Sequence, residues 1–137
     1  APTREDVPPF LNFAPMENAS VALERSAARY EAALAKAWAA GVSAATIQKL
    51  NQGLKDTERL LTDDAGLPRR DWYKHLLYAP GVYTGYNVKT VPAVREAIEA
   101  KAWAEAEIEI ARVAKALMAE SDFVNGVAVE LERDGSR

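Results

Sequence analysis

The chain has 137 residues, a formal net charge of -3 and no cysteine, with 49% hydrophobic and 27% charged residues. This length suits one domain with one hydrophobic core, and the composition is typical of a globular protein. The interleaved charges exclude the basic surface that nucleic acid or anionic lipid selects, and the missing cysteines exclude disulfides and thiolate metal sites. No apolar run approaches the roughly 20 residues of a membrane span. We therefore expect no nucleic acid partner and no membrane contact by this chain.

The N-terminal third predicts an extended lead followed by a long helix. Residues 1–11 contain three prolines and are expected to be extended. Asn12 is a plausible helix cap, and Pro15 suits a first-turn position. The apolar residues that follow recur at steps of three and four: Met16, Ala19, Leu23, Ala27, Tyr30, Leu34 and Trp38. This spacing predicts a first amphipathic helix that ends at Gly41.

A second amphipathic helix is predicted from Ser43, which is a good N-cap. Its expected inner stripe consists of Ile47, Leu50, Leu54, Thr57 and Leu61. Asp63, Asp64 and Gly66 close the helix. The two aspartates are interpreted as a helix end because no further oxygen ligands follow at the spacing of a calcium-binding loop.

The segment from Gly66 to Pro92 is predicted to be a long ordered loop. Glycines and prolines keep it out of continuous helix: Gly66, Pro68, Pro80, Gly81, Gly85 and Pro92. It is also crowded with large side chains, which a flexible linker lacks: Trp72, Tyr73, Leu76, Leu77, Tyr78, Tyr83 and Tyr86. Long ordered loops are often functional, but tyrosines also pack loops onto helices, so both interpretations stay open.

Several polar groups of this loop are able to contact a ligand such as a carboxylate: Tyr83, Tyr86, Arg69, Arg70, Lys74 and Lys89. His75 is the only histidine, so a histidine-rich zinc site cannot be assembled. We expect a partly buried imidazole satisfied by a backbone carbonyl, in preference to a catalytic one. The glycines match no phosphate-binding pattern.

A third helical region is predicted after Thr90 or Val91, with Pro92 in its first turn. Val94 and Ile98 define one apolar stripe. A second stripe, which a straight helix does not continue from the first, contains Trp103, Ala106, Ile110, Val113 or Ala114, and Leu117. This change from one stripe to the other predicts a kink, or two helices meeting, at residues 99–103.

Two features of the C-terminal part are predicted to be peripheral. Glu105, Glu107 and Glu109 are interpreted as a solvated, charge-balanced helix face. Residues 122–137 are interpreted as a C-terminal tail, frayed or locally packed, because the Asn125-Gly126 hairpin signal has flanks too short for a hairpin. The fold class is therefore all-α: a bundle of three to four amphipathic helices with a long ordered loop between the second and third.

The order of these elements and the loop together resemble the transferrin-receptor-like dimerisation domain of the glutamate carboxypeptidase II family. The likeness covers nearly the whole chain, 1–137. Its specific part runs from Gly66-Leu67-Pro68 through Trp72-Tyr73-Lys74-His75-Leu76-Leu77 to Tyr78-Ala79-Pro80. Weaker matches are Val21 to Tyr30, Asn51 to Leu61, Tyr86, Pro92 and Ala97-Ile98.

The resemblance implies a non-catalytic homodimerisation domain whose loop, residues 66–92, reaches the substrate pocket of a zinc peptidase domain. In that family the zinc ligands and the general base lie in the peptidase domain. This chain is therefore expected to carry no cofactor and no activity alone, while its parent is a zinc-dependent carboxypeptidase or aminopeptidase-like enzyme. Peptide substrate is expected to meet the chain through the loop, and the location is expected to be secreted or periplasmic.

The resemblance also implies three substrate-binding positions, Tyr86, Tyr83 and Gly85. Tyr86 matches the tyrosine of a lysine-tyrosine pair that contacts the C-terminal glutamate of substrate in glutamate-preferring members. Gly85 stands at the lysine position, so a charge-assisted contact is lost and a glutamate preference is in doubt. The alternatives are a freestanding helical interaction module without an enzyme domain and, least favoured, an independent enzyme using His75 and Tyr86.

Overall fold

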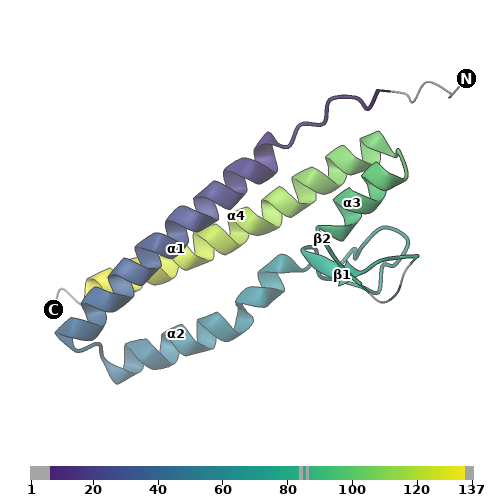
Figure 1. Cartoon of the computed structure of the whole chain (residues 1–137). Coiled ribbons are helices and arrows are strands. Elements are labelled where there is room, and N and C mark those ends of the chain that lie inside the picture. Colours follow the sequence, from purple (N-terminus) through teal and green to yellow (C-terminus); the bar gives the residue numbers. More distant parts are fainter. Residues whose placement is uncertain (1–6, 84, 86, 135–137) are drawn as a thin grey trace, which may run out of the picture.

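The computed structural model describes residues 7–83, 85 and 87–134. Its elements, in chain order, are α1 (Ala14–Ala40), α2 (Ala44–Asp56), the 3-10 helix η1 (Thr57–Leu61), β1 (Tyr78–Pro80), β2 (Val88–Thr90), α3 (Pro92–Glu99) and α4 (Trp103–Asp134). Figure 1 shows the long helices α1 and α4 side by side, with α2 along one flank and α3 beside the two strands at the opposite end. The chain is mostly helical, as predicted, with a small sheet in addition.

Helix α1 confirms the predicted first helix. Pro15 lies in its first turn, and the end is set by Gly41, whose φ is 90°. The N-cap residue is Phe13, so the prediction of Asn12 as the cap is wrong by one position. The Asn12 side chain still accepts a hydrogen bond from the Ala14 N–H at 3.1 Å, which satisfies one of the free donors at the helix start.

Helix α2 begins where it was predicted, because the Thr46 N–H donates to the Ser43 side chain at 3.1 Å. The buried residues of α2 differ from the predicted inner stripe. Leu50 is the one buried residue of the helix, and Leu54 is exposed. The helix then tightens into η1 instead of continuing as an α-helix.

Small buried residues are frequent on α1 and α4, the two long helices that lie side by side. Alanines at 19, 33 and 37 of α1 and at 106, 114, 116 and 128 of α4 are buried. Small side chains let the two backbones approach closely. At the middle of the interface the Ser26 and Ser121 hydroxyls form a buried hydrogen bond of 2.7 Å, which fixes the register of the pair.

Helix α4 continues through the region predicted to be a tail, so that prediction is wrong for residues 122–134. Val127, Ala128 and Leu131 extend the apolar stripe and form a second core cluster with Ala33 and Ala37. Asn125-Gly126 lies inside the helix. Burial of this stripe against α1 outweighs the local turn preference.

The predicted break at residues 99–103 is confirmed as a junction of two helices. Helix α3 starts after Val91, whose φ is 46°, and Pro92 lies in its first turn. The chain turns at Lys101, with a φ of 56°, and its N–H donates to Ile98 O at 3.0 Å. Helix α4 then runs back along α1.

The two short strands form an antiparallel hairpin inside the predicted loop, which the all-α prediction did not include. Tyr78 pairs with Thr90, and Pro80 with Val88. Ala79 is fully buried, so its own backbone N–H and C=O need partners that solvent cannot supply. The sheet provides them.

Candidate functional site

The candidate site begins with a tight turn that only glycine fits. Gly66 has a φ of 70°, and a Cβ there would lie 2.1 Å from Asp71 O. The Leu67 N–H donates to Tyr73 O at 2.9 Å and holds the turn closed. Leu67 and Leu76 are both 2% exposed and belong to the main core cluster. The base of the loop is therefore part of the core.

A buried ion pair, which we name the Arg70–Glu96 clamp, fixes the next part of the loop to α3. Two hydrogen bonds of 2.8 and 2.7 Å join the guanidinium to the carboxylate, and the side chains are 7% and 5% exposed. Glu96 also accepts the Val82 N–H at 3.0 Å, and Arg70 donates to the Pro80 carbonyl. One ion pair thus holds the backbone on both sides of Gly81.

The other cationic side chains of the loop also bond within the chain. Arg69 donates to Glu105 of α4 at 2.8 and 3.1 Å, and this hydrogen bond is the main cause of the raised pKa of Arg69. Lys74 donates to a backbone carbonyl at 2.6 Å, and Lys89 pairs with Glu99. The four cationic groups predicted to meet a ligand therefore serve to hold the loop.

A second charged network joins the start of the loop to α4. Arg112 donates to both Glu109 oxygens at 2.9 Å, to Asp63 at 3.2 Å and to Gly66 O at 2.8 Å. The pKa of Asp63 is lowered, first by the Ala65 N–H and then by Arg112. Glu109 is 4% exposed, so the prediction of a solvated face is wrong for this residue.

Sequence reasoning missed Glu96 and Glu109 as structural anchors. A signal was present for Glu96, which stands among the buried residues Ala93, Val94 and Ala97. A carboxylate in an apolar run must find a partner, because burying an unpaired charge is costly.

His75 is buried, as expected, but its hydrogen bond differs from the prediction. Its Nδ1 accepts the Leu77 N–H at 3.2 Å instead of donating to a carbonyl. Its ring lies 3.9 Å from that of Tyr78, whose hydroxyl donates to Glu58 at 2.6 Å. Burial lowers the pKa of His75, and Glu58, 3.8 Å from Nε2, opposes that shift. Burial therefore favours the neutral form of the imidazole, whose Nε2 has no hydrogen-bond partner among the described residues.

The exposed part of the loop is aromatic and apolar. Trp72, Tyr83 and Val88 are 74%, 89% and 68% exposed. Gly85 is exposed and has a φ of 66°. Of the three predicted substrate-binding positions, the structure thus places Tyr83 and Gly85 at the surface, whereas Tyr86 lies outside the described residues.

A shallow hollow of about 330 Å³ lies between the clamp and this surface. Its lining combines guanidinium, aromatic and backbone groups: Arg69, Arg70, Trp72, Tyr73, Pro80, Gly81, Val82 and Gly85. Both arginines already bond to carboxylates, so the hollow carries little free positive charge. It suits an apolar segment better than a lone anion.

Within residues 7–83, 85 and 87–134, no cluster of three or more histidine, aspartate or glutamate side chains has the arrangement of a metal site. In the same part of the chain, no helix combines the length and apolar character that crossing a bilayer requires.

The family whose model matches this chain is the transferrin receptor-like dimerisation domain, over residues 11–125. Among curated proteins, a probable glutamate carboxypeptidase of Arabidopsis thaliana is 39% identical over 87 residues, covering 58% of this chain and 13% of the relative. A probable glutamate carboxypeptidase of Arthroderma benhamiae is 45% identical over 51 residues, covering 37% of this chain and 7% of the relative.

A third relative is named as an inactive zinc metalloprotease, from Schizosaccharomyces pombe. It is 34% identical over 71 residues, covering 52% of this chain and 9% of the relative. The chain thus spans only a small part of the length of each of these proteins.

Proposed function

Because this chain belongs to the transferrin receptor-like dimerisation domain family, we propose that it is a non-catalytic homodimerisation domain that also supplies a substrate-pocket loop. The loop serves a zinc peptidase domain of the parent protein, a glutamate carboxypeptidase-like enzyme. The observation that carries the proposal is the Arg70–Glu96 clamp, which holds a rigid base beneath an exposed aromatic tip.

The contacts of the polar side chains support a non-catalytic role for this chain. The one histidine holds the turn at Leu77, and the loop cations hold the loop. We assign the zinc, its ligands and the general base to the peptidase domain, and we place the parent outside the cytoplasm, secreted or periplasmic, by family relationship.

A rigid loop is well suited to recognition, because a pre-ordered loop loses little conformational entropy on binding. The clamp fixes the backbone at Pro80 and Val82, directly before Tyr83. We assign the exposed Trp72 and Val88 to contact with the peptidase domain, and Tyr83 and Tyr86 to substrate binding.

Gly85 gives the proposal a specific consequence for substrate choice. A Cβ at this position would meet nothing within 4 Å, so a longer side chain fits. Its left-handed φ of 66° adds a strain of about 1–2 kcal/mol for any other residue. Introducing lysine therefore adds an ammonium next to Tyr86 at a modest energetic cost.

The test measures hydrolysis by the parent protein that contains this chain, with peptides ending in glutamate or alanine. Tyr86→Phe is expected to lower kcat/KM for the glutamate peptide by about tenfold, the loss of a hydrogen bond to a charged group. Gly85→Lys is expected to raise the preference for glutamate over alanine. Ile108→Ala, an exposed α4 position, is the matched control.

Unchanged kcat/KM for both peptides in Tyr86→Phe, Tyr83→Ala and Gly85→Lys would overturn the loop assignment. A parent protein without hydrolytic activity, but with the dimeric mass of this domain retained, would favour the freestanding or inactive interaction role instead. That role matches the relative that is named an inactive zinc metalloprotease.

A further inference from the structure

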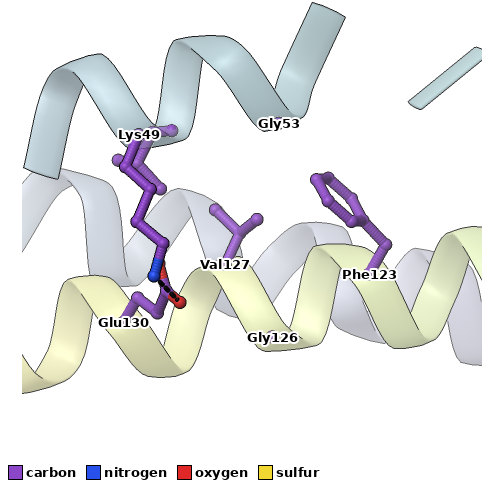
Figure 2. A pocket seen from close by; sticks show the side chains of 7 residues that line it. Lys49, Gly53, Phe123, Gly126, Val127 and Glu130 are labelled. Atoms are coloured by element: carbon purple, nitrogen blue, oxygen red, sulfur yellow. Dashed lines mark hydrogen bonds and ion pairs between the residues drawn. The ribbon is translucent and has the colours of Figure 1, made fainter. Parts of the chain in front are cut away.

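Helix α2 has the fewest buried residues of the α-helices in the described part of the chain, although its sequence is amphipathic. Leu50 is its one buried residue. A cavity of about 270 Å³ separates it from α4, and Figure 2 shows Phe123 and Val127 projecting from α4 into this space, with Lys49 bridging to Glu130 at 2.6 Å. A helix of this length gains its stability mainly from packing.

A second cavity, of about 280 Å³, lies between α2 and the C-terminal half of α1. We name this space the α1–α2 groove, and its lining comprises Tyr30, Leu34, Trp38, Val42, Ile47 and Leu54, with Leu50, Asn51 and Leu131. Among the residues that the structure describes, no charged side chain lines this groove. Trp38 is 65% exposed and Leu54 is 38% exposed, so an open apolar hollow adjoins a protruding indole.

We propose that the α1–α2 groove is the face through which two copies of this chain meet, with the Trp38 indole of each copy entering the groove of the other. This inference rests on the homodimer of the proposed function and names the surface that forms it. A two-fold contact uses the same patch on both subunits, so the patch must carry both a projection and a hollow. Trp38 and the groove satisfy that requirement together.

The chemistry of the groove favours a second copy. Each copy carries a net charge of -3, and an interface through uncharged side chains keeps this repulsion away from the contact. Depletion of charge and enrichment of tryptophan and tyrosine are typical of interface cores. Tryptophan is also enriched among binding hot spots, which lie in well-packed and desolvated pockets.

Two other exposed apolar positions, both on α4, are less suited to this role. Ile108 and Met118 of α4 are ten residues apart in sequence, which corresponds to roughly 15 Å along a helix. The exposed Lys115 lies between them. Trp72 and Tyr83 belong to the loop surface that we assign to the peptidase domain.

The test compares two exposed tryptophans by sedimentation velocity of the 137-residue chain. Trp38→Ala is expected to weaken dimerisation roughly 30-fold or more, the loss typical of a hot spot. Trp72→Ala, on the loop, is the matched control and is expected to change the dimer dissociation constant less than about threefold. Circular dichroism checks that both variants stay folded, and Leu54→Lys, at the opposite rim of the groove, gives an independent disruption.

Hydrogen exchange supplies a second readout. Amides of residues 44–56 are expected to become protected as the concentration of the unsubstituted chain rises through the dimer range, and to stay unprotected in Trp38→Ala. A dimer that tolerates Trp38→Ala and Leu54→Lys would overturn the groove and leave the proposed dimerisation intact. A chain that stays monomeric at high micromolar concentration overturns both.

Discussion

The two ends of this molecule are stabilised in opposite ways. At the loop end, short and irregular segments are fixed by buried charge, with Arg70–Glu96 and Arg112–Glu109 among the least exposed ion pairs. At the α2 end, a regular helix is held by one buried leucine and lies beside two apolar cavities. Regular secondary structure is therefore no guide to rigidity here. The loop end is held by buried contacts of its own, whereas the α2 end leaves apolar space beside it.

The largest loss of stability is expected from breaking the Arg70–Glu96 clamp. Glu96→Gln leaves the Arg70 guanidinium buried without its carboxylate, which typically destabilises a protein by about 3–5 kcal/mol. Chemical denaturation measures the loss. Glu99→Gln is the matched control, since its ion pairs with Lys89 and Arg95 are partly exposed, and it should cost under about 1 kcal/mol. Equal losses for the two variants would contradict a special role for the clamp.

The next largest loss of stability is expected in α2, and it measures how weakly this helix is packed. Leu50→Ala is expected to cost about 2 kcal/mol, the low end for a buried leucine, because cavities already flank the site. Leu54→Ala, at an exposed position, should cost far less. Hydrogen exchange should show the loss in α2 first. Global unfolding without prior opening of α2 would show that the two ends form one cooperative unit.

A smaller, pH-dependent effect is expected at Glu120, on α4 between the two ends. Burial raises its pKa, and its Oε2 has no hydrogen-bond partner among the described residues. Because the folded pKa lies above the unfolded one, this group destabilises the fold at neutral pH, and stability recovers as pH falls through the folded pKa. Glu120→Gln should therefore stabilise the chain by about 1 kcal/mol at pH 7.

Thermal melts across pH 4 to 8 measure this effect. The advantage of Glu120→Gln should shrink as the medium becomes acidic, because the unsubstituted carboxyl is then neutral as well. Glu107→Gln, at an exposed position of the same helix, provides the control. A constant difference over the whole pH range would rule out the burial of Glu120 as its cause.

The smallest change in stability is expected from alanine substitutions at two glycines that line the cavity of Figure 2. A Cβ at Gly126 meets nothing within 4 Å, so Gly126→Ala should stabilise α4 by about 0.5–1 kcal/mol through helix propensity alone. A Cβ at Gly53 would lie 3.0 Å from Phe123 Cζ, so Gly53→Ala should gain less. Denaturation midpoints compare the two, and the reverse order would show that Phe123 moves aside freely.

Local sequence signals located several helix boundaries. Gly41, Ser43 and Pro92 act through the few residues around them, so their helix ends follow from sequence alone. The slipped apolar stripe likewise predicted the junction of α3 and α4. The Asn125-Gly126 signal failed because its preference is worth less than the burial of Val127 and Leu131 against α1.

The candidate site was only partly visible in the sequence. The ordered aromatic loop follows from composition, but the partners of the charged residues do not. Arg70 and Glu96 are 26 residues apart, and Arg112 and Asp63 are 49 apart. Whether an arginine faces ligand, solvent or a carboxylate depends on which segments meet in space.

The sequence by itself determined the place of the helices, the helix ends at Gly41, Ser43 and Pro92, the place of the loop and the family to which the chain belongs, because each rests on short-range spacing or on an ordered motif. Three outcomes were decided by the tertiary structure alone. The cationic side chains of the loop bond within the chain and hold the loop in place. Helix α4 continues past Ser121, and α2 leaves apolar space beside Trp38. These outcomes depend on burial, and burial is a property of segments brought together from distant parts of the chain.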